Sequence, residues 1–400
     1  MEQRYFESLY PADVRSAEIE KILRFVKEGN SCQAIGIPGV GRANLLGFLT
    51  YNRHIRIKHL GAKQTQYHFV MVHFAEVRKR PLFDVMKLVF LSLVDSLRER
   101  GMEEEYRKAN EIFKEILPFA DELVLFQGLK RTIDFLAVEK DLRLVFLFDR
   151  FEEYIPSVTS EFFSNLRSIR NRAKYHFSVV FSVNRPLEDV LEPIIFADFY
   201  EFVAGHTVYL SLFDKSGVAF RISYLEKITG KKLPQETKDE ILHLTGGHGK
   251  LTRLCTEACL SSWSEAIGSP GDSIGASRLQ NDKMVDFLLS QKTVQGAFYE
   301  IWYSLAPSEQ KGILSLDSYS SSEERSDESR SQSDSSRRAS LARTIIATED
   351  SYLQNIGLIA DGKVTIPLFA SFLSTIVASQ AAGSEQIFYD EATNTIKKGD

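Results

Sequence analysis

A glycine-rich segment near the N-terminus constrains the fold of this 400-residue chain more than any other feature. The segment GIPGVGRANLL, residues 36–46, follows the short apolar run CQAI and opens the helical pattern ANLLGFLTYNRHI. A G-x-x-x-x-G spacing between a strand and a helix is the context in which a P-loop wraps phosphate groups. We therefore expect a loop whose backbone N–H groups and following helix N-terminus face an anion.

Two positions depart from the P-loop pattern G-x-x-x-x-G-K-[ST]. Arg42 replaces the lysine, and Ala43 replaces the hydroxyl residue that normally ligates Mg²⁺. A guanidinium keeps the positive charge of lysine, but its larger planar head does not fit the same pocket. Asn44 has a carbonyl oxygen but faces another direction on the helix. We expect affinity for ATP or ADP to persist and Mg²⁺ binding to be weakened.

The loop supplies most of the candidate nucleotide-binding residues. A G-x-x-x-x-G match alone also occurs by chance, but the flanking strand and helix favour a P-loop fold. The candidates in the loop are Gly36, Pro38, Gly39, Val40, Gly41, Arg42, Ala43 and Asn44.

Strand and helix patterns alternate along the first half of the chain. The segments 67–77, 142–154 and 176–190 each begin with an apolar, β-branched and aromatic run, and polar turns and helical patterns accompany these runs. Repeated βα units predict an α/β fold with a parallel sheet between helices and ligands at the carboxyl ends of the strands. We assign residues 1–212 to a P-loop NTPase core of this kind.

The second half of the chain predicts smaller domains. Residues 213–267 are helical in pattern and suit a lid domain, and residues 278–380 suit a winged-helix-like domain with a turn at Asp361-Gly362. A Ser/Arg/Glu-rich stretch, 315–340, has nothing to bury and predicts a disordered insertion. Residues 385–400 alternate apolar and polar side chains and predict the start of a further domain, cut at residue 400.

Acidic residues follow the apolar run LVFLF. Asp149 ends this run and is the natural Walker B carboxylate, which holds Mg²⁺ through water. Glu152 is the candidate catalytic residue. If the end of the strand curls back, Glu152 or Glu153 can orient a water molecule. The alternative, which we favour, is that both glutamates form the exposed start of a helix.

Polar residues at two further turns are candidate phosphate contacts. Asn184 ends the run SVVFSVN at the position of a sensor residue, and Arg185 beside it pairs with phosphate or with Asp149. Both are equally well explained as ordinary polar groups at a strand end. His248, in TGGHGK, contacts a phosphate under one interpretation and is a helix cap or a surface residue under the other.

Composition limits the classes of partner and compartment. The net charge of -5 gives the whole molecule no attraction to nucleic acid, so any DNA contact has to be local. Three cysteines without nearby ligand partners form neither a disulfide framework nor a zinc signature. Because no stretch reaches the ~18 apolar residues of a membrane helix, we expect a cytoplasmic protein without a membrane partner.

These motifs in this order resemble the STAND branch of AAA-like P-loop ATPases, especially bacterial proteins that join such a core to winged-helix domains of transcriptional regulators. The resemblance covers about residues 5–380 and rests on YPADVRSAEI, GIPGVGRANLL, VFLFDRFEEY, SVNRPLEDV, LTGGHGKLTRL and GLIADGKVTIPLFASFL. It implies that Pro11 and Arg15 lie near the adenine pocket. In this family, bound ADP or ATP sets a closed or an open state.

The sequence departs from the family pattern at positions whose side chains bind the nucleotide or act in its hydrolysis. The departures are Arg42, Ala43, Arg150 in place of a glutamate, and Gly249 in place of a proline. The hypothesis is therefore a regulatory nucleotide-binding switch with weak or absent hydrolysis, in signal transduction or transcriptional regulation. One alternative is an active ATPase that uses displaced groups such as Glu152.

The other alternative is a DNA-binding or interaction scaffold that binds no nucleotide. The partners we expect are DNA, through the winged helix or a further C-terminal domain, a protein, or a second copy of the chain. The candidate recognition helix ATEDSYLQNI is acidic, which argues against a contact between that helix and DNA phosphates.

Overall fold

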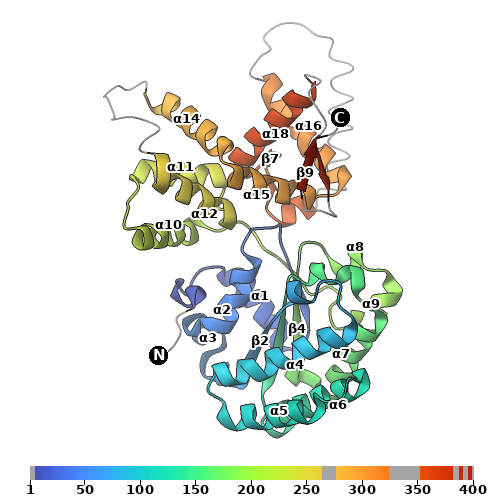
Figure 1. The fold of residues 1–400 in the computed structure, drawn as a ribbon. Helices are drawn as coiled ribbons and strands as arrows, with labels where there is room; N and C mark the ends of the chain where they lie inside the picture. Colours follow the sequence, from blue (N-terminus) through green and yellow to red (C-terminus); the bar gives the residue numbers. More distant parts are fainter. Residues whose placement is uncertain (1–4, 264–275, 324–351, 382–386, 391–394, 399–400) are drawn as a thin grey trace. The chain divides into compact units, whose positions relative to one another are not determined.

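The computed structural model describes residues 5–263, 276–323, 352–381, 387–390 and 395–398 (Figure 1). Contacts divide the chain into two units, Met1–Ser211 and Leu212–Asp400. The first unit carries the glycine-rich loop and the strands that surround it. Each unit is described by itself.

The first unit is built on a five-stranded parallel sheet with the order β2-β3-β4-β1-β5. All strands run in one direction, so their carboxyl ends meet at one edge of the sheet. Because β1 lies beside β4, and β4 beside β3, the loop after β1 is close to the ends of both. The strands are β1 (Cys32–Ile35), β2 (Tyr67–His73), β3 (Arg143–Asp149), β4 (Phe177–Val183) and β5 (Thr207–Tyr209).

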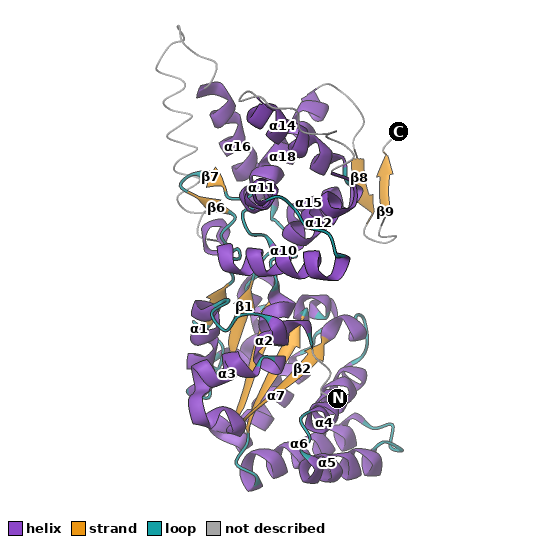
Figure 2. Ribbon diagram, turned by 90° about the vertical axis from the view of Figure 1, so that its left-hand side faces the viewer, coloured by secondary structure: helices purple, strands orange, loops and turns teal. Residues whose placement is uncertain are grey.

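Helices cover both faces of this sheet, as Figures 1 and 2 show. Helices α1 and α2 pack on one face, and α4 and α7 pack on the other, as right-handed crossovers between parallel strands require. This arrangement confirms the expected α/β class. The helices are α1 (Ser16–Lys27), α2 (Arg42–Tyr51), α3 (Arg53–Leu60), α4 (Leu82–Glu99), α5 (Glu103–Ile116), α6 (Glu122–Asp134), α7 (Ser160–Ala173), α8 (Leu187–Val190) and α9 (Pro193–Tyr200).

Aromatic side chains fill the core behind the carboxyl edge of the sheet. Phe148 on β3 packs against Phe74, with ring centroids 4.8 Å apart, and against Phe181 on β4 at 5.5 Å. Phe151 packs on Phe181 at 5.0 Å, and all four side chains are fully buried. The chain that follows β3 is therefore anchored in the core as soon as it leaves the sheet.

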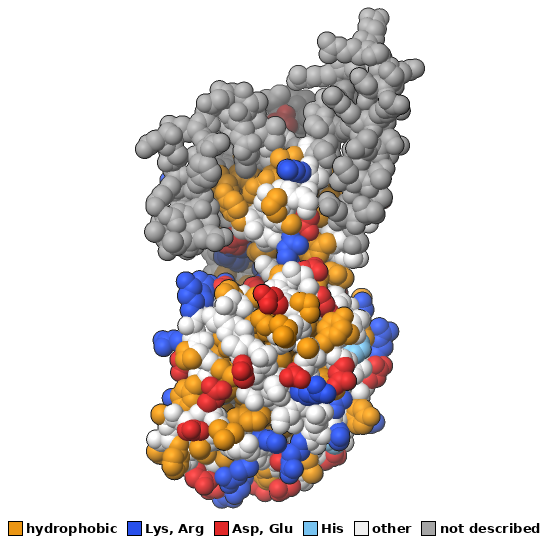
Figure 3. Space-filling model, turned by 90° about the vertical axis from the view of Figure 1, so that its right-hand side faces the viewer, with side chains coloured by type: hydrophobic (Ala, Val, Ile, Leu, Met, Phe, Trp, Pro, Cys, Tyr) orange, Lys and Arg blue, Asp and Glu red, His pale blue; other side chains and the backbone are white. Residues whose placement is uncertain are grey.

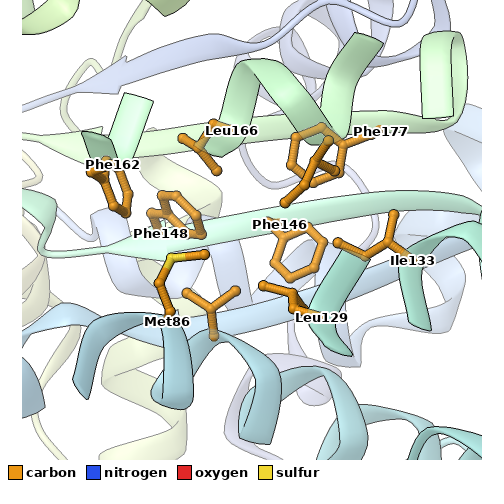
Figure 4. Close-up of a pocket in the computed structure, with 10 residues that line it drawn as sticks. Met86, Leu129, Ile133, Phe146, Phe148, Phe162, Leu166 and Phe177 are labelled. Atoms are coloured by element: carbon orange, nitrogen blue, oxygen red, sulfur yellow. The ribbon is translucent and has the colours of Figure 1, made fainter. Parts of the chain in front are cut away.

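A small void lies deeper in the same core, between α4, α6, α7 and the sheet (Figure 4). Its volume is about 10 Å³, and apolar side chains such as Met86, Leu129, Phe146 and Leu166 line it. A space of this size holds at most one water, and a water needs polar partners. The void is a packing defect rather than a ligand site.

The described residues of the second unit are mainly helical. Two short antiparallel hairpins, β6–β7 and β8–β9, accompany the helices. The turn of the first is Asp361-Gly362, where both residues have positive φ, 51° and 71°, as a tight hairpin requires. The elements are α10 (Lys215–Thr229), α11 (Gln235–Thr245), α12 (Gly249–Ala258), α14 (Ala276–Ser290), α15 (Lys292–Tyr303), α16 (Pro307–Glu323), β6 (Ile359–Ala360), β7 (Lys363–Val364), α18 (Pro367–Ala381), β8 (Ile387–Asp390) and β9 (Thr395–Lys398).

Helix α16 differs from the sequence-based expectation. It continues to Glu323 and so includes residues 315–323, which were expected to belong to the disordered insertion. Glu309 in its first turn accepts a hydrogen bond from the Ala306 N–H, and Ile313 in the next turn is buried. A helix that has been nucleated extends at little cost per residue. The remainder of the expected insertion, 324–340, lies outside the described residues.

None of the described helices combines the length and the apolar content that crossing a membrane needs.

Candidate functional site

The loop between β1 and α2 has a backbone that only glycine adopts readily. Gly39 has φ 80° and Gly41 has φ 106°. At Gly36, a Cβ atom would lie 2.8 Å from Val40 Cγ1. Gly41 is the N-cap of α2, and among the described residues no side chain caps that end. The first N–H groups of α2 are therefore available to an anion in the concave side of the loop.

Arg15 supports this loop with its guanidinium group. Its Nη2 donates to the carbonyl of Val40 at 2.7 Å, and its Nη1 donates to the carbonyl of Ser211 at 2.9 Å. The residue is 6% exposed and has a left-handed backbone, φ 53°. Arg15 thus lies against the backbone of the loop, whereas the family resemblance implied a place near adenine. Pro11 is exposed, and its carbonyl accepts from the Val14 N–H. The adenine contact of both residues stays a prediction.

The N-terminal segment is fastened to α2 beside the loop. Glu7 accepts a hydrogen bond from the side-chain amide of Asn44 at 3.1 Å, and Asn52 donates to the Glu7 carbonyl at 2.9 Å. The contact is close, since a Cβ at Gly47 would lie 2.5 Å from Glu7 Cγ. The amide of Asn44 is therefore directed to Glu7, and Ala43 beside it is exposed. Sequence reasoning did not identify Glu7.

Arg42, at the lysine position of the loop, forms an ion pair with Glu152 through its Nη2 atom. Both side chains are largely buried, with exposures of 11% and 18%. Among the described residues, the other guanidinium nitrogen, Nη1, and the other carboxylate oxygen, Oε2, are buried without a hydrogen-bond partner. The pair thus retains one donor and one acceptor that a ligand can engage.

The position of Glu152 follows from the way the chain leaves β3. Arg150 has a left-handed backbone, φ 54°, which turns the chain directly after Asp149. Phe151 and Tyr154 are both fully buried and hold the short 3₁₀ helix Phe151–Glu153 between them. The glutamates were expected at the exposed start of a helix. Both do lie in the first turn of the short 3₁₀ helix, but the expected exposure is wrong, because the buried aromatic rings pull the segment inward and leave the two side chains only 18% and 17% exposed.

The neighbouring carboxylates also have cationic partners. Glu153 pairs with Arg78 and, at 2.6 Å, with Arg150. Asp149 is 4% exposed, and its Oδ2 lies 3.2 Å from Nδ1 of His73, the residue opposite it in the β2–β3 register. This hydrogen bond raises the pKa of His73 above its usual value. Sequence reasoning missed His73, although it ends an apolar run as Asp149 does.

The donor set fits a nucleotide better than it fits Mg²⁺. Asp149 Oδ1 is buried and has no partner among the described residues, so one oxygen ligand is available. The other oxygen is held by His73, and Ala43 offers no hydroxyl. Mg²⁺ prefers an octahedron of oxygens and here would depend on water and phosphate for nearly all of them.

The remaining predicted residues lie in both units. Asn184 and Arg185 follow β4 at the carboxyl edge of the sheet and are half-buried. Their phosphate contact stays a prediction. His248, in the second unit, is fully buried, and its Nδ1 accepts the N–H of Leu251 at 3.3 Å as the N-cap of α12. The cap agrees with one of the two interpretations of His248, and its phosphate contact stays a prediction.

The comparisons with known proteins concern the fold. No family model and no curated protein matches the chain. A solved Walker-type ATPase of Pyrococcus abyssi is 13% identical, with a TM-score of 0.52 over 94% of this chain and 98% of that one. The ORC2 protein of Aeropyrum pernix, solved in ADPNP-ADP complexes, is 15% identical, with a TM-score of 0.37 over 96% and 86% of the two chains.

Cdc6p from Pyrobaculum aerophilum is 12% identical, with a TM-score of 0.39 over 92% of this chain and 94% of that one. The likeness to the Pyrococcus protein agrees with the five-stranded parallel sheet and with the glycine loop between β1 and α2. This chain therefore has the α/β P-loop NTPase fold.

Proposed function

We propose that this protein is a nucleotide-binding regulatory switch of the STAND or AAA type, which holds ATP or ADP and hydrolyses nucleotide weakly or not at all. One observation carries the proposal. The loop keeps the backbone geometry of a phosphate cradle, while Glu152, the candidate for orienting a water, is paired with Arg42.

The binding half of the proposal rests on the backbone. The left-handed glycines Gly39 and Gly41 shape the loop, and the uncapped start of α2 points N–H groups into it. Arg42 adds a positive charge, and its buried Nη1 has no partner among the described residues. A diphosphate or triphosphate group supplies the acceptors that these donors lack.

The proposal that hydrolysis is weak or absent rests on the contacts that the carboxylates near the loop already make. Phosphoryl transfer to water needs a group that orients the water, and it needs a metal that offsets the charge developing on the phosphate. Glu152 and Glu153 are ion-paired, and one oxygen of Asp149 is held by His73. Arg150 and Ala43 contribute neither a carboxylate nor a hydroxyl at their positions. Turnover is therefore slow or absent under this proposal.

The cellular role belongs to the same proposal. We place the protein in the cytoplasm, in signal transduction or transcriptional regulation, with a protein, a second copy or DNA as its partner. The hairpin β6–β7, followed by α18, has the order of a winged helix, which supports a regulatory output. On the face of the first unit that Figure 3 shows, acidic and basic side chains are interspersed, which favours a protein partner there over DNA.

Two assays on the purified chain test the proposal. Equilibrium binding of a fluorescent ATP analogue measures affinity, and phosphate release measures turnover on the same preparation. We expect saturable binding with phosphate release at most slightly faster than that of buffer alone. Absence of binding at millimolar concentrations would refute the proposal and favour the scaffold alternative. Phosphate release far above the rate of buffer alone, which Asp149→Asn abolishes, would also refute it and favour an active ATPase.

A further inference from the structure

We infer that the Arg42–Glu152 pair makes the loop selective for a nucleoside diphosphate over a triphosphate. The inference rests on the proposed nucleotide binding and goes beyond it, because it names the number of phosphates that the site accepts and the residues that decide it. It follows from the position of the pair, its burial and the way in which Glu152 is held.

The pair spans the strand ends where a third phosphate belongs. Arg42 begins α2 after β1, Glu152 follows β3, and β4 lies between these strands in the sheet. In P-loop proteins the residue at the lysine position reaches the β- and γ-phosphates. The acidic residue at the end of the strand that corresponds to β3 lies on the side of the γ-phosphate. The carboxylate of Glu152 therefore stands beside the place of a terminal phosphate.

Charge at this place disfavours a triphosphate. A γ-phosphate would approach the carboxylates of Glu152 and Asp149. Glu152 is largely buried, and Asp149 is almost completely buried. Burial reduces screening by water, so repulsion between like charges is stronger here than at the surface. The metal that usually offsets this repulsion lacks the hydroxyl ligand at Ala43.

A diphosphate avoids this conflict and can use the pair as it stands. Its terminal phosphate lies at the β position, which the loop backbone and the start of α2 surround. The guanidinium of Arg42 donates to Glu152 through Nη2, while Nη1 is buried without a partner among the described residues. A planar guanidinium donates in two directions at once, so Nη1 can bind a β-phosphate oxygen while Nη2 retains Glu152.

Glu152 cannot readily move away to admit a third phosphate. Its neighbours Phe151 and Tyr154 are fully buried in the aromatic core, with ring centroids 6.3 Å apart. Glu153, in the same 3₁₀ helix, is held by Arg78 and Arg150. The segment is therefore anchored on both sides of Glu152, and release of Arg42 would leave the buried carboxylate without its cation.

Calorimetric titration of ADP and of ATP, in EDTA, tests the inference on three proteins. The wild type should bind ADP at least about tenfold more tightly than ATP. Glu152→Gln keeps an amide oxygen that accepts from Arg42 but removes the charge. In this variant the affinity for ATP should rise by at least about tenfold, so that the preference for ADP disappears. The matched control is Glu104→Gln, which removes a carboxylate on α5 that pairs with Lys140, does not touch Arg42 or the segment after β3, and should keep the wild-type preference.

The outcomes separate this inference from the proposed function. Equal affinity for ADP and ATP in the wild type, or an unchanged preference in Glu152→Gln, would overturn the inference while nucleotide binding stands. Failure of both nucleotides to bind any of the three proteins would overturn the proposed function and the inference with it. Far-UV circular dichroism checks the fold of each variant, and the wild-type ratio alone decides the matter if Glu152→Gln does not fold.

Discussion

Replacement of Arg15 by alanine tests whether the protein's own side chains hold the phosphate loop in place. The buried guanidinium donates to the carbonyls of Val40, in the loop, and Ser211, after β5, at 2.7 and 2.9 Å. It also pairs with Glu18 at 2.9 Å. Alanine removes all three contacts, and the two carbonyls lose a charged donor that no neighbouring side chain can replace without a rearrangement.

The expected loss of stability follows from these contacts. A hydrogen bond from a charged group contributes about 1.5–3 kcal/mol, so the two lost bonds to carbonyls cost roughly 3–6 kcal/mol. The ion pair with Glu18 adds little, because Glu18 keeps a hydrogen bond from the Ser211 hydroxyl at 2.9 Å. For a domain of this size, about 3 kcal/mol lowers the melting temperature by roughly 6–12 °C.

The assay uses the positions of the two tryptophans. Trp263 and Trp302 both lie in the second unit, so tryptophan fluorescence follows that unit, while far-UV circular dichroism follows both. Arg15→Ala should lower the transition seen by circular dichroism alone. Lys58→Ala removes an exposed ion pair with Asp13 and should leave both signals within about 2 °C of the wild type. An unchanged melting temperature together with weaker ADP binding would refute the reasoning and place Arg15 at the nucleotide.

Three further predictions concern the loop, the second unit and pH. Gly41→Ala should weaken ADP binding, measured by calorimetry, by at least about tenfold, because an alanine at φ 106° is strained by about 1–3 kcal/mol. An unchanged affinity would count against the loop as the binding site. Gly246→Ala should destabilise the second unit by about 2–4 kcal/mol in urea unfolding followed by tryptophan fluorescence, since its Cβ would lie 2.1 Å from the Thr365 carbonyl oxygen. The control Gly230→Ala, with φ 70° but open space around it, should cost only about 1 kcal/mol. Burial lowers the pKa of His68 to about 3, so the stability that its neutral form supports is present above pH 6.5 and falls as the pH drops toward 3. Between pH 6.5 and 5 the wild type should lose about 2 kcal/mol more than His68→Gln, and parallel losses in the two proteins would contradict this assignment.

The sheet and its loop could be predicted because their signals are local. Strands β3 and β4 are buried on both faces, so each is a nearly continuous apolar run in the sequence. The loop is recognisable because Gly39 and Gly41 occupy positions whose φ angles exclude most other residues. Both features depend only on residues that are adjacent in the chain, and the hairpin turn at Asp361-Gly362 is predictable for the same reason.

The ion pairs of the site could not be predicted, because they depend on strand order and register. Arg42 meets Glu152 only because β4 alone separates β1 from β3, an order that periodicity does not reveal. His73 meets Asp149 because the two end paired strands in register. Arg15 and Ser211, which are joined by a hydrogen bond, lie 196 positions apart in the sequence, so no local pattern predicts their contact. These contacts decide whether each charged group is free to act on a ligand.

Calorimetric titration of ADP with and without Mg²⁺, on the wild type and Arg42→Ala, tests the central claim most directly. We predict that ADP binds the wild type with an affinity that changes less than about threefold on addition of Mg²⁺, and that Arg42→Ala binds at least about tenfold more weakly. An affinity that rises steeply with Mg²⁺ would contradict the account and indicate a metal-dependent nucleotide site at Asp149. Wild-type protein that binds no ADP at millimolar concentrations would contradict it as well, and would leave the loop only a structural role.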